Sequence, residues 1–420
     1  MNWNASFAWR TAQMHRSPVR ELLKATERPE VISFAGGLPG ADLLPLEAME
    51  AASERVLGKH GQQAAQYGPT EGLPELREWI AERFSTEQVR LSGANVAMVS
   101  GGQQGLDLIG RIFLNPGDRV AVENPTYLAL LSAWRPLGVE FLPVSCDRDG
   151  LRIDELHAAL GRRPKLIYSI PDFQNPQGTT LALSRRRQLV RLAAEHGVGI
   201  VEDGAYTDLR YEGQSLPQLF ELSREEGRAG ETGSIFVGTF SKLLMPGLRV
   251  GWVVAPEVVI ETLVRAKQSA DLHTSSFTQW LTWELIQDDF LARHVPRLQA
   301  AYRERRDAML LALERSMPPG VSWTVPEGGM FLMITLPEDT DVPELLRRAL
   351  ESKVAFVPGE DFHLGGMGRN TIRLNFSHAT PALIREGVRR LGELGPLSRN
   401  GRPEATRLVR AAGRRLNPAA

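Results

Sequence analysis

The chain of 420 residues lacks the features that mark several specialised classes of protein. Its single cysteine, Cys146, excludes an intramolecular disulfide framework and any cysteine-based metal cluster. No run of about 18 uncharged apolar residues occurs, and the amino-terminal residues contain no long apolar segment typical of a secretion signal. The 49 basic and 50 acidic residues nearly cancel, so no strong field attracts nucleic acid or a membrane surface. We therefore expect a cytoplasmic protein that binds a small molecule, with no nucleic-acid, membrane or metal partner.

The sequence also has no internal repeat, and low complexity is confined to its end. Residues 398–420 hold six arginines and one glutamate among glycine, proline and alanine. We expect this basic tail to be a loosely held, solvated extension, with contact to an acidic partner as the alternative.

Between about residues 55 and 290, short apolar runs alternate with segments of helical period. The apolar runs, which are typical of buried strands, lie at 96–99, 119–122, 166–170, 198–201, 235–237 and 250–254. Helical patterns lie between most of them, at 73–84, 104–113, 153–160 and 184–195. This alternation predicts an α/β fold in which helices cover both faces of a mostly parallel sheet.

The pattern changes after a long amphipathic stretch at 290–317, where strand-like runs at 321–325, 330–334 and 372–376 alternate with helical segments. These runs predict a second, smaller α+β domain. We expect a large domain at 51–295, a small domain at 296–397 and the tail at 398–420. Residues 1–50, with a helix beginning near Ser17 and Pro18, are expected to pack with the small domain.

Polar groups follow the predicted strands of the large domain, at the edge where ligands of open α/β sheets bind. In chain order, the five strand ends carry a glycine-rich turn at 100–104, Tyr127, Asn175, Asp203 with Tyr206, and Lys242. Each has an ordinary structural explanation. Glycine suits a tight turn, Asn-Pro pairs form turns, a carboxylate often caps a helix, and most lysines are exposed.

Taken together, these groups match what pyridoxal phosphate requires of a protein. A helix that opens on free backbone N–H groups binds a phosphate, an anion keeps the pyridine nitrogen protonated, and a lysine forms a Schiff base with the aldehyde. A nicotinamide dehydrogenase is a weaker alternative, because the glycine-rich turn does not follow the G-x-G-x-x-G pattern.

The chain resembles the class I and II aminotransferases, which are fold-type I pyridoxal-phosphate enzymes. It is most similar to those that act on 2-aminoadipate or on branched-chain and aromatic amino acids. The resemblance extends from about Ser17 to Gly395. Its motifs are FAGGLPG at 34–40, YGPTEG at 67–72, SGGQQ at 100–104, ENPTY at 123–127, NPQG at 175–178, EDGAY at 202–206, SK at 241–242 with Arg249, and RLNF at 373–376.

The resemblance implies a large pyridoxal-phosphate-binding domain and a role for each matching residue. Lys242 would form the Schiff base and then move the proton between the substrate Cα and C4′ of the cofactor, because desolvation beside Arg249 lowers its pKa. Asp203 would hold the pyridine nitrogen, Tyr206 and Asn175 the phenolic oxygen, and Tyr127 would lie on the ring. The phosphate would be bound by Arg249, Thr239, Ser241 and the amides of Gly102 and Gln103. Gly102 departs from the family, which usually has a hydroxyl there.

On the substrate side, the resemblance implies that Arg373 binds the α-carboxylate, with Gly37 and Asn175 beside it. Arg20 would meet a distal carboxylate of an acidic substrate, although an exposed arginine on an amphipathic helix is an equally good interpretation. Tyr67 would reach the phosphate of a neighbouring subunit, which implies a homodimer.

The expected reaction moves an amino group between an L-amino acid and a 2-oxo acid, with glutamate and 2-oxoglutarate as one pair. Another fold-type I enzyme, such as a decarboxylase or lyase, remains an alternative because the fold does not select the chemistry. The other alternative is the pyridoxal-phosphate-binding effector domain of a transcription regulator. Such regulators carry an amino-terminal helix-turn-helix, for which we expect no room before the family-like pattern.

Overall fold

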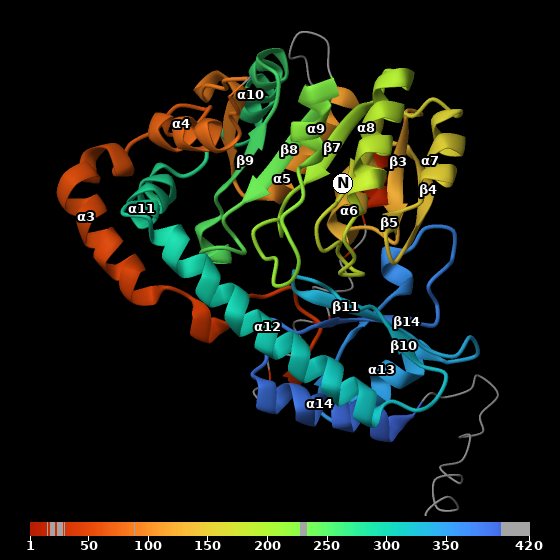
Figure 1. The fold of residues 1–420 in the computed structure, drawn as a ribbon. Coiled ribbons are helices and arrows are strands. Elements are labelled where there is room, and N and C mark those ends of the chain that lie inside the picture. The colour runs from red at the N-terminus through yellow and green to blue at the C-terminus, as the bar shows by residue number, and fades with distance from the viewer. Residues whose placement is uncertain are drawn as a thin grey trace, which may run out of the picture.

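The computed structural model of the chain describes residues 1–14, 16, 22, 28, 30–87, 89–226 and 233–395. Within these residues, a larger unit is built on an eight-stranded sheet and a smaller one on a four-stranded sheet (Figure 1). The α/β fold predicted from the sequence pattern is confirmed. None of the described helices combines the length and the apolar composition that crossing a bilayer requires.

The large sheet has the strand order β2-β9-β8-β7-β6-β3-β4-β5. The strands are β2 (Val96–Val99), β3 (Arg119–Asn124), β4 (Glu140–Asp147), β5 (Gly150–Leu151), β6 (Leu166–Ser169), β7 (Gly199–Asp203), β8 (Ser234–Thr239) and β9 (Gly251–Val254). Pairing is parallel from β4 through β3, β6 and β7 to β8, whereas β9 is antiparallel to both its neighbours and β5 to β4. The sequence pattern missed β4, because its partly exposed residues interrupt an apolar run.

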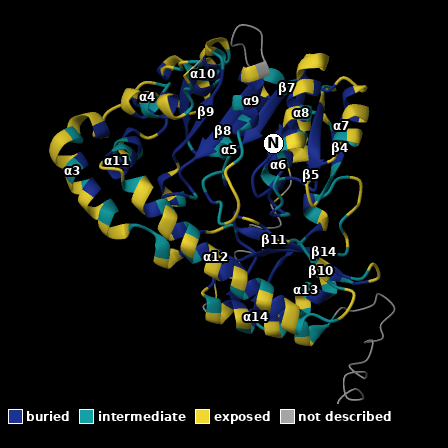
Figure 2. Ribbon diagram, viewed as in Figure 1, coloured by how far each residue is buried: buried dark blue, intermediate teal, exposed yellow. Residues whose placement is uncertain are grey.

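Helices cover both faces of this sheet (Figures 1 and 2). They are α4 (Pro74–Arg83), α5 (Gly102–Phe113), α6 (Leu128–Trp134), α7 (Ile153–Leu160), α8 (Leu183–His196), α9 (Leu219–Glu226), α10 (Glu257–Asp271) and α11 (Ser276–Ile286), together with α3 (Leu46–Ala65), which packs on α11. The side chains of successive residues in β3 point to opposite faces of the sheet. Val120 and Val122 belong to the same buried cluster as Ile109 of α5, whereas Ala121 belongs to the cluster that contains Leu189 of α8.

The smaller unit follows the long helix α12 (Phe290–Ser316), which runs from one unit to the other (Figure 1). Its antiparallel sheet has the order β10-β11-β14-β13 and is covered by α13 (Val342–Glu351) and α14 (Pro381–Leu394). The strands are β10 (Ser322–Trp323), β11 (Phe331–Thr335), β13 (Val357–Pro358) and β14 (Thr371–Asn375). Strand β1 (Ile32–Ser33) pairs with β12 (Val354–Ala355), so these early residues share the core of the small unit.

Short elements complete the described chain. Near the start, α1 (Trp3–Ser6) and η1 (Trp9–Gln13) precede the strands, and η1 lies against η4 (Arg135–Leu137). The remaining 3-10 turns are η2 (Ala41–Leu43), η3 (Gly93–Asn95), η6 (Pro246–Leu248) and η7 (Glu360–Phe362). The turn η6 matters for the site, because it connects Lys242 to Arg249.

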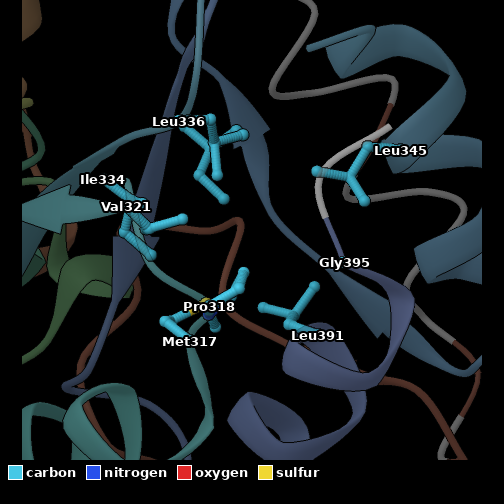
Figure 3. A pocket seen from close by; sticks show the side chains of 9 residues that line it. Met317, Pro318, Val321, Ile334, Leu336, Leu345, Leu391 and Gly395 are labelled. Carbon is cyan, nitrogen blue, oxygen red and sulfur yellow. The ribbon is translucent and has the colours of Figure 1, made fainter. Parts of the chain in front are cut away.

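One small cavity of about 20 Å³ lies inside the smaller unit, between α14 and the sheet (Figure 3). Its lining is apolar and includes Ile334, Leu345 and Leu391. A space of this size holds at most about one water molecule, and its walls offer no polar side chain to bind one. This cavity is therefore a packing gap, and an amino acid must bind elsewhere.

Candidate active site

A second cavity, of about 740 Å³, lies where strands β3, β6, β7 and β8 end and where residues of the small unit meet them. The predicted site residues that line it are Gly37, Gly102, Gln103, Tyr127, Asn175, Asp203, Tyr206, Thr239, Ser241, Lys242, Arg249 and Arg373. The fold therefore brings together side chains that the sequence separates by more than 300 residues. Its size is suitable for a cofactor and a small substrate.

Lys242 follows β8, and its Nζ donates a hydrogen bond to the carbonyl of Gly37 at 2.8 Å. The pKa of Lys242 is lowered to about 8. Burial is the main cause, and the nearby cations Arg249 and Arg373 add to it, while Asp203 opposes the shift. A sizeable fraction of this amine is therefore neutral near pH 8, whereas an exposed lysine is almost entirely charged. Only the neutral amine can attack a carbonyl or accept a proton.

The turn before α5 has the geometry of an anion-binding loop. Gly101 has a φ of +82°, and a Cβ there would lie 2.5 Å from Nη2 of Arg249, so this position requires glycine. Gly102 and Gln103 open the helix, whose first N–H groups have no intrahelical partner. Arg249 itself has a left-handed backbone with φ +52°, and its guanidinium donates to the carbonyl of Ser100 at 3.1 Å.

Two hydroxyls face the same loop from the end of β8. Thr239 Oγ1 donates to Ser241 Oγ at 2.9 Å and accepts from the backbone N–H of Ser241 at 3.1 Å. Gly102, in contrast to Gly101, has room for a side chain: its Cβ would come no closer than 3.5 Å to Val237. The missing family hydroxyl at Gly102 is therefore not imposed by a lack of space.

Asp203 ends β7 and is held by two donors, Tyr168 Oη at 2.8 Å and the backbone N–H of Ala205 at 3.2 Å. Burial raises the pKa of Asp203 to about 6, although both hydrogen bonds and Lys242 oppose the rise. This carboxylate is therefore mostly ionised at neutral pH, and in a buried setting it would bind a protonated ring nitrogen strongly.

Arg373 comes from β14 of the small unit and is buried. Its guanidinium donates to Asn175 Oδ1 at 2.9 Å and to the carbonyl of Ala35 at 2.6 Å, both of which are neutral groups. Its Nε has no hydrogen-bond partner among the described residues, and the group lies over the rings of Phe331 and Phe362. Burial lowers the pKa of Arg373 to about 10, so it remains charged and can bind a carboxylate.

The two tyrosines of the cavity lie near Arg373. Tyr206 is buried and packs edge-on against Phe331, and burial raises its pKa while a hydrogen bond with Asn175 opposes this. Tyr127 lines the cavity at the start of α6. Two flat rings and an amide at this edge provide the stacking surface and donors that a planar heterocycle needs.

One predicted site residue of the described chain is not part of this cavity. Tyr67 is 77% exposed and lies edge-on to His273, with ring centroids 5.7 Å apart. Arg20 lies outside the described residues, as do Ser17 and the tail at 398–420.

Sequence reasoning missed several contributors to the site, among them Tyr168, Leu128 and Phe362. Tyr168 was assigned only to a buried strand, yet it pairs with Val201, two residues before Asp203, so its hydroxyl reaches the carboxylate. Leu128 and Phe362 line the cavity but belong to apolar patterns that are typical of any core. Tyr168 is the one that a sequence signal could have found, because a buried tyrosine usually needs a partner for its hydroxyl.

The donor set fits pyridoxal phosphate. Three cationic side chains, the open helix amides and two hydroxyls suit a phosphate and a carboxylate, and Asp203 suits the ring nitrogen.

Comparison with known proteins leads to the same cofactor. The profile of the family described as aminotransferase class I and II matches residues 30–391.

Two similar proteins have assigned activities. The chain is 43% identical to aromatic-amino-acid aminotransferase 1 of Thermococcus litoralis, covering 94% of each chain. It is also 43% identical to 2-aminoadipate transaminase of Thermus thermophilus, covering 93% of this chain and 97% of that one.

A solved structure is also similar: the α-aminoadipate aminotransferase of Thermus thermophilus, complexed with N-(5'-phosphopyridoxyl)-L-leucine. It superposes with a TM-score of 0.88 at 42% identity, covering 94% of this chain and 98% of that one. The resemblance, the cofactor and the transfer of amino groups that the sequence predicted are confirmed. The chain thus belongs to the class I and II aminotransferases and uses pyridoxal phosphate to move amino groups between amino acids and 2-oxo acids.

Proposed function

We propose that Arg373 binds the α-carboxylate of the amino acid within reach of Lys242. The observation that carries this proposal is the buried guanidinium whose Nε has no partner among the described residues and whose other bonds go to neutral groups. A carboxylate would neutralise this buried charge, whose present partners are neutral. Asn175 and the backbone around Gly37 would hold the same end of the substrate, since Asn175 already bonds to Arg373 and Gly37 to Lys242.

The cofactor supplies an aldehyde that condenses with amines and a ring that accepts the electrons of a carbanion. We assign its phosphate to Arg249, Thr239, Ser241 and the amides of Gly102 and Gln103. Asp203 holds the proton on the ring nitrogen, and Tyr206 and Asn175 donate to the phenolic oxygen. Tyr127 covers one face of the ring.

Lys242 is the group that moves the proton. With the cofactor bound, the Nζ of Lys242 would accept the proton from the substrate Cα and deliver it at C4′, because burial favours the neutral amine. Arg373 favours transamination over decarboxylation, because a carboxylate held by a guanidinium is retained.

The substrate pair is proposed to be glutamate with 2-oxoglutarate on one side and 2-aminoadipate, a branched-chain or an aromatic amino acid on the other. The apolar walls at Leu38, Leu128 and Phe362 suit an apolar side chain. Arg20, outside the described residues, is proposed to meet a distal carboxylate. The names of the two relatives agree with both uses.

We further propose a cytoplasmic homodimer. Tyr67 is 77% exposed, although large aromatic side chains are usually mostly buried. A second subunit that buries Tyr67 and receives its hydroxyl at the phosphate would explain this exposure.

The test is to mix the purified holoenzyme with single amino acids and follow the visible absorption of the bound cofactor. Glutamate should bleach it, and each accepted donor should release its 2-oxo acid. Release of carbon dioxide would support a decarboxylase and release of ammonia a lyase. No bleaching with any donor, glutamate included, would contradict the proposal and favour the regulator.

A further inference from the structure

An ion pair between a fully buried lysine and a partly exposed aspartate lies next to the anion-binding loop. Lys267 of α10 has a side chain with no exposed surface, and its Nζ donates to both carboxylate oxygens of Asp271, at 2.8 and 2.9 Å. Lysine is rarely buried to this degree. Ion pairs between exposed residues on one helix contribute little to stability, and burying a charge costs free energy. The pair therefore calls for an explanation other than the stability of α10.

The ion pair holds both ends of one amide. Gln104 Oε1 accepts from Lys267 Nζ at 2.9 Å, and Gln104 Nε2 donates to Asp271 Oδ2 at 2.6 Å. Hydrogen bonds at both ends leave the amide one orientation. Burial lowers the pKa of Lys267, whereas the hydrogen bonds to Asp271 keep that carboxylate's pKa below its ordinary value despite desolvation. The hydrogen bonds thus join Lys267, Asp271 and Gln104 in one network.

From this amide the network reaches the loop. Gln104 Oε1 also accepts the backbone N–H of Ser100 at 2.7 Å, and Ser100 Oγ donates to Asp271 Oδ2 at 3.2 Å. The carbonyl of the same Ser100 accepts from Arg249 at 3.1 Å. Ser100 is therefore fixed through its N–H, hydroxyl and carbonyl, immediately before the strained Gly101.

We propose that Lys267, Asp271 and Gln104 are positioning residues that hold the loop at 100–103 and the guanidinium of Arg249 in the geometry that binds the cofactor phosphate. None of the three lines the cavity, so they act through Ser100 and Arg249. The inference rests on the proposed placement of the phosphate. It also accounts for a loop that binds phosphate without a hydroxyl at Gly102, because a rigid set of backbone donors needs less reorganisation on binding.

The test compares pyridoxal phosphate with pyridoxal, which has the same ring and aldehyde but no phosphate. Gln104→Met keeps the volume and the Lys267–Asp271 ion pair but removes the amide's bond to the Ser100 N–H and its bonds to Lys267 and Asp271. We expect its Kd for pyridoxal phosphate, measured by absorption on the apoenzyme, to rise about 10- to 30-fold. The Kd for pyridoxal should change less than about twofold, since Lys242 and Asp203 are untouched.

Three variants complete the experiment. Ser100→Ala removes the hydroxyl that bonds to Asp271 and Thr274 and should raise the Kd for pyridoxal phosphate by a few fold. Arg265→Met removes an exposed pair with Glu261 on the same helix and should change neither Kd. Arg249→Ala tests the phosphate placement itself.

The outcomes separate the two ideas. Equal losses for both ligands in Gln104→Met would indicate a general structural role and overturn the inference, as would no loss for either. If Arg249→Ala weakens pyridoxal phosphate selectively but Gln104→Met and Ser100→Ala do not, the inference alone is wrong. If Arg249→Ala weakens both ligands equally, the proposed phosphate site is wrong.

Discussion

The two ends of the cavity are built in opposite ways. At the cofactor end, Ser100 and Asp203 have their polar groups satisfied by protein donors and acceptors, and these residues come from strand ends of one sheet. At the substrate end, Arg373 comes from the other unit and its Nε has no partner among the described residues. The cofactor end is suited to a ligand that stays, because its geometry is already formed. The substrate end is suited to ligands that exchange, because binding there satisfies a group that is otherwise unpaired.

The largest expected effect concerns the residue between the two ends. Lys242→Ala should lower the rate of 2-oxo acid release from glutamate by at least about 1,000-fold, because no other described group is assigned to move the Cα proton. Single-turnover assays with the loaded enzyme measure this. Lys59→Ala, at an exposed position on α3, is the control and should retain full activity. A loss below about tenfold in Lys242→Ala would exclude the assignment.

At the substrate end, Arg373→Gln should lower kcat/KM about 100-fold, equivalent to about 3 kcal/mol, because a buried carboxylate loses its guanidinium. The Kd for pyridoxal phosphate should change less than about threefold, which would separate the two ends. Arg369→Gln, which removes an exposed pair with Glu360, should leave both values unchanged. If Arg373→Gln also raised the Kd for pyridoxal phosphate about 100-fold, the substrate end and the cofactor end would not be separate sites.

The pH dependence of cofactor binding tests the cofactor end of the cavity directly. The pKa of Lys242 is lowered to about 8, so the neutral amine increases as pH rises toward 8 and levels off above it. The rate of condensation between apoenzyme and pyridoxal phosphate should therefore rise about 50-fold from pH 6 to pH 8. Stopped-flow absorption measures this rate. A rate that continued to rise steeply to pH 10 would indicate an ordinary, exposed lysine.

Gly101→Ala should weaken pyridoxal phosphate about 30-fold, because its Cβ would collide with Arg249 and its backbone is left-handed. Gly102→Ala, one residue on, should have almost no effect, since a Cβ there makes ordinary contacts. Equilibrium titration of the two apoenzymes compares them. Equal affinities would show that the loop adapts and is not preformed.

The smallest expected effect is an increase in affinity for pyridoxal phosphate. Gly102→Ser adds the hydroxyl that the family usually has, in a place with room for it. One further hydrogen bond to the phosphate should tighten binding about fivefold, equivalent to about 1 kcal/mol. The same titration with pyridoxal should show no gain. A tighter complex with both ligands would mean that the serine stabilises the loop and does not contact the phosphate.

Much of the fold and most of the cofactor end could be predicted from the sequence, because their signals are local. The strand at 96–99, the turn at 100–104 and the Lys242 segment are each recognisable within a few residues, and parallel strands place their ends at one edge. Strand β4 was missed because its apolar run is interrupted. Tyr168 was recognised only as part of a buried strand, although a buried tyrosine hydroxyl usually needs a partner. Lys267 was missed because nothing local distinguishes a buried lysine from an exposed one.

What the sequence determined by itself was therefore the order of chemical groups along the sheet and, through it, the cofactor and the reaction. Only the tertiary structure decided that Arg373 meets Asn175, 198 residues away, and that Lys267 lies buried behind the loop. The physical reason is that periodicity and turn chemistry report on a few neighbouring residues. Burial and pairing depend on how whole units pack, and packing sets the pKa of Lys242 and the unpaired state of the Arg373 Nε among the described residues.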